Sequence, residues 1–349
     1  MPEVRGRAAR IKVIGVGGAG SNAVERMYKA GVQGVEFLAA NTDLQDLEST
    51  ECEQKIQLGE DITRGLGAGG DPEVGLRAAE ESRQDVKNAL DGSDMVFITC
   101  GMGGGTGTGA SPAVAEVCRE LGSLTVAVVT RPFSFERGRR AQIADDGIER
   151  LKTKVDSIIT IANDRLLDRF DKTVPIIEAF RRADEVLRQG VQGISDLITM
   201  PGLINLDFAD VRNVLAEAGV TLMGIGEGTG EHRAADAANA AISSPLLELP
   251  MEGARRILLN IAGGEDLAMS EAEEAAQIVA GATTTLDTNV FWGLTLSKEM
   301  GDLVRITVIA TGFGGVPEHR EPVQAMAQEM AAQAESSSEL EIPSFLRKR

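Results

Sequence analysis

The stretch Gly101-Met-Gly-Gly-Gly-Thr-Gly-Thr-Gly109 decides how this chain is interpreted, because five of its last seven residues are glycine. The apolar run Met95–Cys100 before it is typical of a buried parallel strand, and residues 113–121 after it have the spacing of an amphipathic helix. At such a junction, glycines leave backbone N–H groups free to surround an anion, which the helix dipole also favours. Each glycine costs about 0.5–1 kcal/mol of chain entropy, so a turn alone does not require so many. The stretch predicts a phosphate-binding loop, with hydroxyl groups from Thr106 and Thr108 available to phosphate oxygens.

A second glycine loop, Gly15-x-Gly17-x-x-Gly20, lies near the N-terminus between a short apolar run and a helical pattern. With Asp43 at the end of the next apolar run, it has the form of a dinucleotide-binding fingerprint, which favours an NAD-dependent oxidoreductase. One dinucleotide pyrophosphate does not need two phosphate loops, however. The Walker pattern is absent, because the chain contains no Gly-Lys pair.

The composition narrows the class of protein. A net charge of −18 over 349 residues argues against binding to nucleic acid or anionic lipid, which are polyanions themselves. Three cysteines and two histidines give neither a metal-ligand spacing nor a disulfide framework, so we expect a reducing, cytoplasmic location. No apolar run reaches the roughly 18 residues of a membrane span, and we expect no transmembrane segment.

From residue 11 to about 165, apolar runs alternate with helical patterns, which predicts βαβ units on a parallel sheet. A third glycine-rich loop, 65–72, precedes a predicted helix over Pro72–Leu90. A helical pattern of about 25 residues, from about Val174 to Met200, is long enough to link two domains. Further strands and helices to residue 314 predict a second α/β domain with a mixed sheet, in which we expect Trp292 to be buried.

Three motifs in this order resemble the FtsZ family of tubulin-like GTPases of bacterial cell division. The loop Gly103–Gly109 is similar to the family's phosphate loop, Asn205-Leu-Asp-Phe-Ala-Asp210 to its catalytic loop, and Ile342-Pro-Ser-Phe-Leu-Arg347 to its partner-binding peptide. The resemblance runs from about Ile11 to Phe313 and returns in the tail. It implies a tubulin-like α/β fold: a Rossmann-like parallel-sheet GTPase domain joined by a long central helix to a smaller α/β domain with a mixed sheet.

The resemblance also implies an organisation along the chain. We expect an N-terminal extension (1–10), a GTP-binding domain (11–173), a central helix (174–201), a C-terminal GTPase-activating domain (202–314), a flexible linker (315–338) and a partner-binding C-terminal peptide (339–349). The implied GTP contacts are Gly17, Gly18, Asn22, Ala68, Gly69, Gly70, Gly103, Gly104, Gly105, Thr106, Gly107, Thr108, Gly109, Glu136, Arg140, Asn163, Phe180 and Asp184. Glu136 and Arg140 match ribose contacts, and the last three residues match guanine contacts.

Elementary chemistry agrees with the guanine assignment. Guanine presents two donors, N1–H and N2–H₂, on one edge, and a carboxylate such as that of Asp184 accepts both, whereas adenine presents an acceptor there. Phe180 lies four residues earlier, on the same helix face, so its ring could stack on the base. Without the resemblance, core packing for Phe180 and a solvated charge for Asp184 would be the preferred interpretations.

Asp207 and Asp210, with Asn205, are the implied catalytic residues. Their spacing puts both carboxylates on one face of a helix start, where they could orient a water attacking a γ-phosphate in a neighbouring subunit. The same spacing fits simple helix capping, and both roles are compatible. A nucleotide-binding assembly protein without catalysis is a further alternative, in which replacing Asp210 by alanine would leave turnover unchanged.

The resemblance implies several partners. These are GTP or GDP, Mg²⁺ without a confident side-chain ligand, and further copies of the chain in head-to-tail protofilaments. Membrane-anchor and regulatory division proteins would bind through Ile342, Pro343, Phe345, Leu346 and Arg347. The implied location is the cytoplasmic mid-cell division ring, on the inner face of the membrane.

Overall fold

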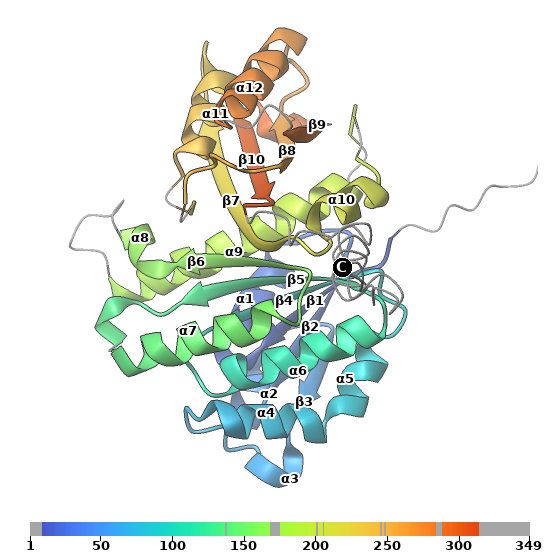
Figure 1. The fold of residues 1–349 in the computed structure, drawn as a ribbon, viewed down its shortest axis with the longest axis vertical. Coiled ribbons are helices and arrows are strands. Elements are labelled where there is room, and N and C mark those ends of the chain that lie inside the picture. Colours follow the sequence, from blue (N-terminus) through green and yellow to red (C-terminus); the bar gives the residue numbers. More distant parts are fainter. Residues whose placement is uncertain are drawn as a thin grey trace, which may run out of the picture. The chain divides into compact units, whose positions relative to one another are not determined.

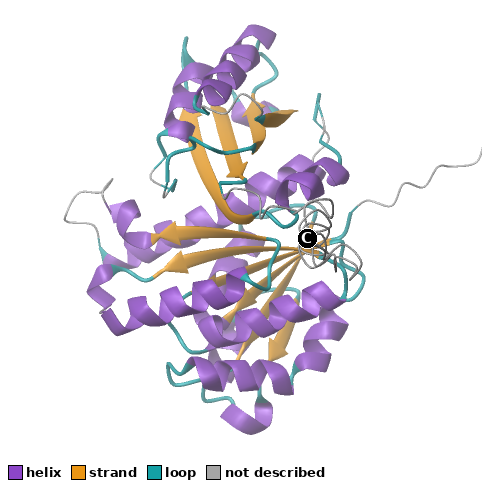
Figure 2. Cartoon of the chain, in the orientation of Figure 1, coloured by secondary structure: helices purple, strands orange, loops and turns teal. Residues whose placement is uncertain are grey.

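The computed structural model describes residues 9–136, 138–167, 175–199, 202–204, 206–244, 246–247, 249–283 and 288–313 (Figure 1). Asn205, most of the expected N-terminal extension, the linker and the C-terminal peptide lie outside the described residues. Ten strands form one mixed sheet in the order β3-β2-β1-β4-β5-β6-β7-β10-β8-β9. The fold is therefore α/β with helices around a central sheet, as Figure 2 shows in purple and orange.

The first seven strands in this order are all parallel, which confirms the βαβ prediction. Their bounds are β1 Ile11–Val16, β2 Val35–Asn41, β3 Gln54–Gln57, β4 Met95–Gly101, β5 Leu124–Arg131, β6 Ser157–Ala162 and β7 Gly219–Gly228. Beyond β7 the sheet is mixed: β10 (Val304–Thr311) is antiparallel to both β7 and β8 (Arg256–Gly263), and β9 (Asn289–Leu296) is parallel to β8.

Strand β7 belongs to both parts of the sheet. Its first three residues pair with Ser157–Ile159 of β6, and its remaining residues, Leu222–Gly228, pair with β10. One continuous strand therefore carries the backbone hydrogen bonds from the parallel part into the mixed part. Because β7 takes part in both, the domain boundaries expected above stay predictions.

Apolar side chains alternate between two cores, one on each face of the parallel strands. On one face, Val13, Phe97 and Val126 pack in a cluster that includes residues of α1 (Gly17–Lys29), α9 (Ile176–Thr199) and α10 (Phe208–Leu215). On the other face, Ile14 and Ile98 pack in a cluster that includes residues of the helices on that side. Because these strands are buried on both faces, their sequences are nearly continuous apolar runs.

The remaining helices complete the two layers around the sheet. Their bounds are α2 Leu44–Ser49, α3 Glu60–Thr63, α4 Pro72–Glu81, α5 Arg83–Leu90, α6 Thr106–Glu120, α7 Gly138–Lys152, α8 Asn163–Leu167, α11 Arg233–Ile242 and α12 Met269–Gly281. Two short 3₁₀ turns, η1 Ser134–Glu136 and η2 Lys298–Met300, lie in loops.

Two local predictions were wrong. The single helix expected over Pro72–Leu90 is two helices, α4 and α5, separated at Ser82. The Ser82 hydroxyl accepts a hydrogen bond from the Gly59 amide (3.0 Å) and donates to the Gln57 carbonyl (3.2 Å), so contacts from a distant loop hold the break. Trp292, expected to be buried, is only half-buried, because it stands on β9 at the open edge of the sheet.

Candidate functional site

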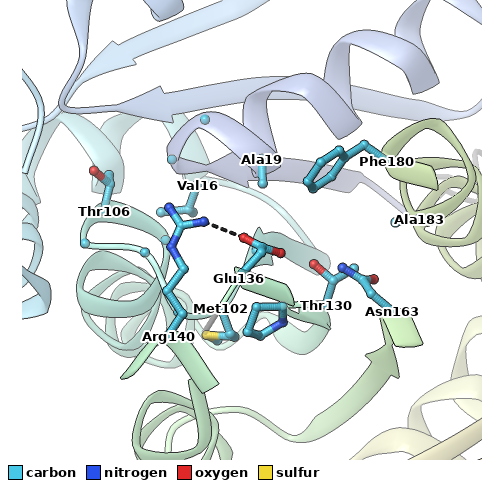
Figure 3. Close-up of a pocket in the computed structure, with 18 of the residues that line it drawn as sticks. Val16, Ala19, Met102, Thr106, Thr130, Glu136, Arg140, Asn163, Phe180 and Ala183 are labelled. Atoms are coloured by element: carbon cyan, nitrogen blue, oxygen red, sulfur yellow. Dashed lines mark hydrogen bonds and ion pairs between the residues drawn. The ribbon is translucent and has the colours of Figure 1, made fainter. Parts of the chain in front are cut away.

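A cavity of about 340 Å³ lies where β1 and β4 end and the two glycine loops begin. Ligands of open parallel sheets bind at this edge, beyond the carboxyl ends of the strands. Figure 3 shows Thr106 at one end of the cavity and Phe180, Ala183 and Asn163 toward the other. The described lining residues are Val16, Gly17, Gly18, Ala19, Gly101, Met102, Gly103, Gly104, Gly105, Thr106, Gly107, Thr130, Pro132, Glu136, Arg140, Asn163, Phe180, Ala183 and Asp184.

The two glycine loops touch each other at the floor of the cavity. Gly17 has a φ of +73°, and a Cβ added there would lie 2.8 Å from the Gly107 amide nitrogen. A Cβ on Gly101 would lie 2.7 Å from the Ala19 methyl group. Neither contact leaves room for a side chain, so backbone atoms of two separate loops form one wall. Two loops that are far apart in the sequence therefore line the same cavity.

Gly104 differs from its neighbours in the loop. A Cβ added there would meet no atom within 4 Å. The position therefore faces open space, and because Gly104 lines the cavity, that space is part of the cavity.

The third loop lies against the second without lining the cavity. The Ala68 methyl group would be 2.9 Å from a Cβ on Gly105, whereas Gly69 and Gly70 are exposed and have positive φ values of 59° and 79°. A nucleotide contact by these three residues stays a prediction.

The residues at the start of α6 have different tasks. Thr106 lines the cavity, and its hydroxyl lies 2.6 Å from that of Thr42. Thr108 is buried, and its hydroxyl accepts a hydrogen bond from the Gly103 amide (2.9 Å), which fixes the shape of the loop. A Cβ on Gly109 would overlap the Pro72 carbonyl oxygen, so this glycine allows α6 to pack against α4. Thr108 and Gly109 do not appear in the cavity wall, and their role as contacts stays a prediction.

Glu136 and Arg140 form an ion pair in the middle of the cavity (Figure 3). The Glu136 carboxylate also accepts a hydrogen bond from the Phe133 amide at 2.9 Å. Both side chains are thereby held between the glycine loops and the far end of the cavity, and their contact to a ribose stays a prediction.

The far end combines a ring, an amide and a carboxylate. Phe180 is 41% exposed and lines the cavity (Figure 3), and its ring stands nearly perpendicular to that of Phe133 with a centroid distance of 5.3 Å. The buried Oδ1 atom of Asn163 accepts no hydrogen bond from the described residues. A buried acceptor without a donor is costly, and a ligand N–H would satisfy it.

Asp184 completes this end, and burial raises its pKa to about 6. Its side chain is 14% exposed, and its Oδ2 atom lies 3.2 Å from Nε of Arg26, which opposes the increase. Sequence reasoning missed Arg26, because nothing in the sequence distinguishes a basic residue near the end of α1 from a solvated one. Arg26 lies 158 positions from Asp184, and only the packing of α1 beside α9 brings the two together.

Two other residues from the sequence analysis lie outside the cavity wall. Asn22 is exposed on α1, and its contact to nucleotide stays a prediction. Asp43 is the N-cap of α2, where its Oδ1 atom accepts hydrogen bonds from the amides of Gln45 (3.0 Å) and Asp46 (3.2 Å). Its carboxylate thus caps the chain's own helix, and Asp43 is not among the residues that line the cavity.

Asp207 and Asp210 lie at the start of α10, away from the cavity. Asp207 is the N-cap, and its carboxylate accepts a hydrogen bond from the Asp210 amide at 2.8 Å, so the capping role is real. Arg212 on the same helix donates to the carbonyl of Asp94, the residue before β4 (3.4 Å). The helix therefore lies at the amino ends of strands whose carboxyl ends form the cavity, as the arrowheads of β5 and β6 and the place of α10 show in Figure 1.

None of the described helices combines the length and the apolar character that crossing a membrane requires.

Comparison with known proteins agrees with this geometry. Residues 10–171 match the model of the GTPase domain of the tubulin/FtsZ family, and residues 219–314 match that of the C-terminal domain of the FtsZ family. A solved structure of an empty FtsZ dimer from M. jannaschii is 44% identical with a TM-score of 0.83, covering 87% of this chain and 88% of that one. A GTPγS-bound protofilament of CetZ2 from Haloferax volcanii, 23% identical with a TM-score of 0.74, covers 93% of this chain and 99% of that one and shares the fold.

The family models together span more than half of the chain, and the FtsZ structure matches most of it at high identity. The chain belongs to the FtsZ family of tubulin-like GTPases.

Proposed function

We propose that the chain is a polymerising GTPase whose copies assemble head to tail into protofilaments of the cytokinetic ring. GTP bound in one subunit is hydrolysed with Asp207 and Asp210 of the adjoining subunit, and hydrolysis destabilises the filament. One observation carries the proposal: the cavity and the two acids lie at opposite ends of the same parallel strands. A subunit cannot bring its own acids to its own nucleotide, whereas head-to-tail stacking brings one subunit's acids to the next subunit's cavity.

Exposed apolar side chains at the cavity end support such stacking. Leu66 is 83% exposed, and its loop is tied to Asp43 by a β-bridge and packs through Ala68 against the second glycine loop. Phe135 is 52% exposed and adjoins the cavity residue Glu136. Large apolar groups left in water beside a ligand site are typical of an interface that a partner covers.

A second apolar surface lies along β9. An open groove of about 460 Å³ lies between α12 and β9, with Met269, Val290 and Trp292 in its wall. Strand β9 itself adjoins the segment before Asp207, because the Leu203 amide donates to the Leu294 carbonyl of β9 at 2.9 Å. An apolar groove along β9 and apolar side chains beside the cavity suit contact between two copies of the chain.

In this assignment the residues divide the chemistry between two subunits. Backbone amides of the glycine loops hold the phosphates, and the stacked Phe180 with Asn163 and Asp184 holds the base. The capped start of α10 fixes Asp207 and Asp210 of the neighbour, so that a carboxylate orients the attacking water, as positioned bases do in other nucleotide hydrolases. Loss of the γ-phosphate removes charge from the interface, which makes assembly depend on the nucleotide state.

Mg²⁺ is part of the proposal as the partner of the nucleotide. The described residues contain no group of three or more His, Cys, Asp or Glu side chains that could hold a metal ion. Phosphate oxygens held by the glycine loops are hard ligands of the kind Mg²⁺ prefers. When bound there, the ion neutralises negative charge on the phosphates.

The location and the further partners rest on the family alone. We expect the chain at the mid-cell ring on the cytoplasmic face of the membrane. Ile342, Pro343, Phe345, Leu346 and Arg347, which lie outside the described residues, would bind membrane-anchor and regulatory division proteins.

The first test is GTP turnover per subunit across a protein dilution series with Mg²⁺, together with light scattering. A site shared between subunits predicts that turnover and scattering both appear above a threshold concentration. Turnover per subunit that does not change on dilution would mean a site complete within one chain, and the assignment of Asp207 and Asp210 would then be wrong.

A mixing experiment tests the shared site directly. Asp210→Asn removes the charge of one acid, and Gly104→Val fills the open space of the cavity, so each variant alone should lose at least about 100-fold in turnover. In a mixture, an Asp210→Asn subunit supplies the cavity and a Gly104→Val subunit supplies the acids. About a quarter of the contacts in an equal mixture are then complete, so turnover should return to a sizeable fraction of wild type. No recovery, with both variants assembling, would contradict the proposal.

A further inference from the structure

A groove on the outer side of the cavity wall contains four arginines. It lies between α1 and α9, with Arg26, Arg181, Arg182 and Arg188 in its wall beside Glu178 and Glu185. Most of these charges are paired within the groove: Glu178 with Arg181 and Arg182, and Glu185 with Arg188. Arg26 is different, because its partner Asp184 lines the nucleotide cavity on the other side of α9.

We infer that Arg26 is a positioning residue for guanine recognition, which keeps the Asp184 carboxylate ionised and oriented toward the base. The inference rests on the proposed role of Asp184 as the acceptor for guanine N1–H and N2–H₂. Only the ionised carboxylate accepts both bonds, since a protonated carboxyl group presents a donor to a donor edge.

The packing of α1 against α9 holds Arg26 beside Asp184. Helix α1 begins in the cavity wall at Gly17 and ends at Lys29, and Arg26 near its end contacts Asp184 of α9, which also lines the cavity. Val24 and Met27, on either side of Arg26, are buried in the same apolar cluster as Ala183 and Leu187, on either side of Asp184. Core packing of the two helices thereby sets the 3.2 Å ion pair.

Among the described residues, Arg26 is the charged group that lowers the pKa of Asp184. Glu136 and Arg140 line the same cavity but neutralise each other in an ion pair. Asn163 on α8 is uncharged at any pH. Burial favours the protonated form of Asp184 and Arg26 favours the ionised form, so the two effects oppose each other at this carboxylate.

The consequence is that the loss of GDP affinity on removing Arg26 should depend on pH. With the pKa of Asp184 at about 6, removing Arg26 should raise it by roughly one unit. The ionised fraction then falls about fivefold at pH 6, about twofold at pH 7 and by less than about 1.2-fold at pH 8. A loss caused by general structural damage would be the same at every pH.

The experiment measures GDP affinity by titration calorimetry at pH 6, 7 and 8 for wild type and four variants. Arg26→Gln should lose affinity with the pH dependence above, and Arg26→Lys, which keeps the charge, should stay within about twofold of wild type. Arg181→Gln is the matched control, because this exposed arginine of the same groove pairs with Glu178 and should bind GDP as wild type does. Comparison with wild type cancels the titration of the GDP phosphates themselves.

Asp184→Asn separates failure of the inference from failure of the site. If this variant binds GDP as wild type does, Asp184 is no guanine acceptor, and the assignment and the inference fall together. If it loses affinity while Arg26→Gln matches Arg181→Gln, or loses affinity equally at all three pH values, the inference alone is overturned. A loss for Arg26→Gln that is greatest at pH 6 and nearly gone at pH 8 supports it.

Discussion

Two glycine-rich stretches in this chain look alike and do opposite things. Gly101–Gly109 follows a strand and opens a cavity, whereas Gly224-Ile-Gly-Glu-Gly228 lies within β7 and closes a gap. A Cβ on Gly224, Gly226 or Gly228 would overlap a backbone carbonyl of α11, so these glycines allow the alanine-rich helix to lie directly on the strand. The difference lies in placement: glycines at every second strand residue share one face, but clustered glycines at a strand end free the amides.

The largest effect is expected from filling the open space at Gly104, which tests whether this glycine stretch faces a ligand. Gly104→Val should lower GDP affinity by about 10³-fold, because the side chain takes the place of the phosphates, while the free energy of unfolding changes by less than about 1 kcal/mol. Gly281→Val is the control, since a Cβ there also meets nothing within 4 Å but lies at the end of α12. GDP titration and urea unfolding measure the two quantities. Equal GDP affinity for the two variants would show that Gly104 does not face the ligand.

Gly226→Ala should have the complementary effect. The added methyl group overlaps the Ala237 carbonyl, so α11 must move away from β7, at a cost of about 1–3 kcal/mol in the free energy of unfolding. Folded Gly226→Ala protein should bind GDP as wild type does, because β7 does not line the nucleotide cavity. Urea denaturation measures the loss. If unfolding were unchanged and GDP binding weakened, the second glycine stretch would belong to a ligand site after all.

The two glycine stretches also show which features of the structure can be predicted from the sequence alone. Apolar runs at regular intervals were enough for most of the parallel strands but not for β3, whose sequence is polar, and the glycine loops were enough to place a cavity at the strand ends. Tertiary contacts decided the rest: the break at Ser82 depends on Gln57 and Gly59, and the task of Gly109 depends on the Pro72 carbonyl. The partnership of Arg26 with Asp184 also has no local signal, because each residue alone resembles a solvated helix charge.

The spacing of Asp207 and Asp210 shows that one sequence pattern can fit two interpretations. Its spacing to Asp210 fits both capping and catalysis, and the cap is present in the folded chain. A carboxylate that caps its own helix is held in a fixed position, which is also what a group acting on a neighbouring subunit requires. The two interpretations therefore describe one arrangement, and only turnover can separate them.

The smallest expected effect is the pH dependence of GDP affinity, which distinguishes the two ends of the cavity. Backbone amides of the glycine loops do not titrate, whereas Asp184 at the base end has a pKa raised to about 6 by burial. If Asp184 accepts the hydrogen bonds of guanine, as we propose, only the ionised carboxylate accepts both, so protons compete with the base and affinity falls as the pH decreases. From pH 8 to pH 5.5 the ionised fraction drops about fourfold.

GDP affinity should fall by that factor beyond the decrease for Asp184→Asn, which keeps the phosphate end and lacks the titrating group. Calorimetric titration of both proteins across this range isolates the contribution of the base end, because titration of the GDP phosphates is common to the two. Parallel pH profiles would mean that the carboxylate does not meet the guanine edge. A profile that diverges below about pH 6.5 places the pH sensitivity at Asp184 and leaves the glycine loops as a pH-independent phosphate site.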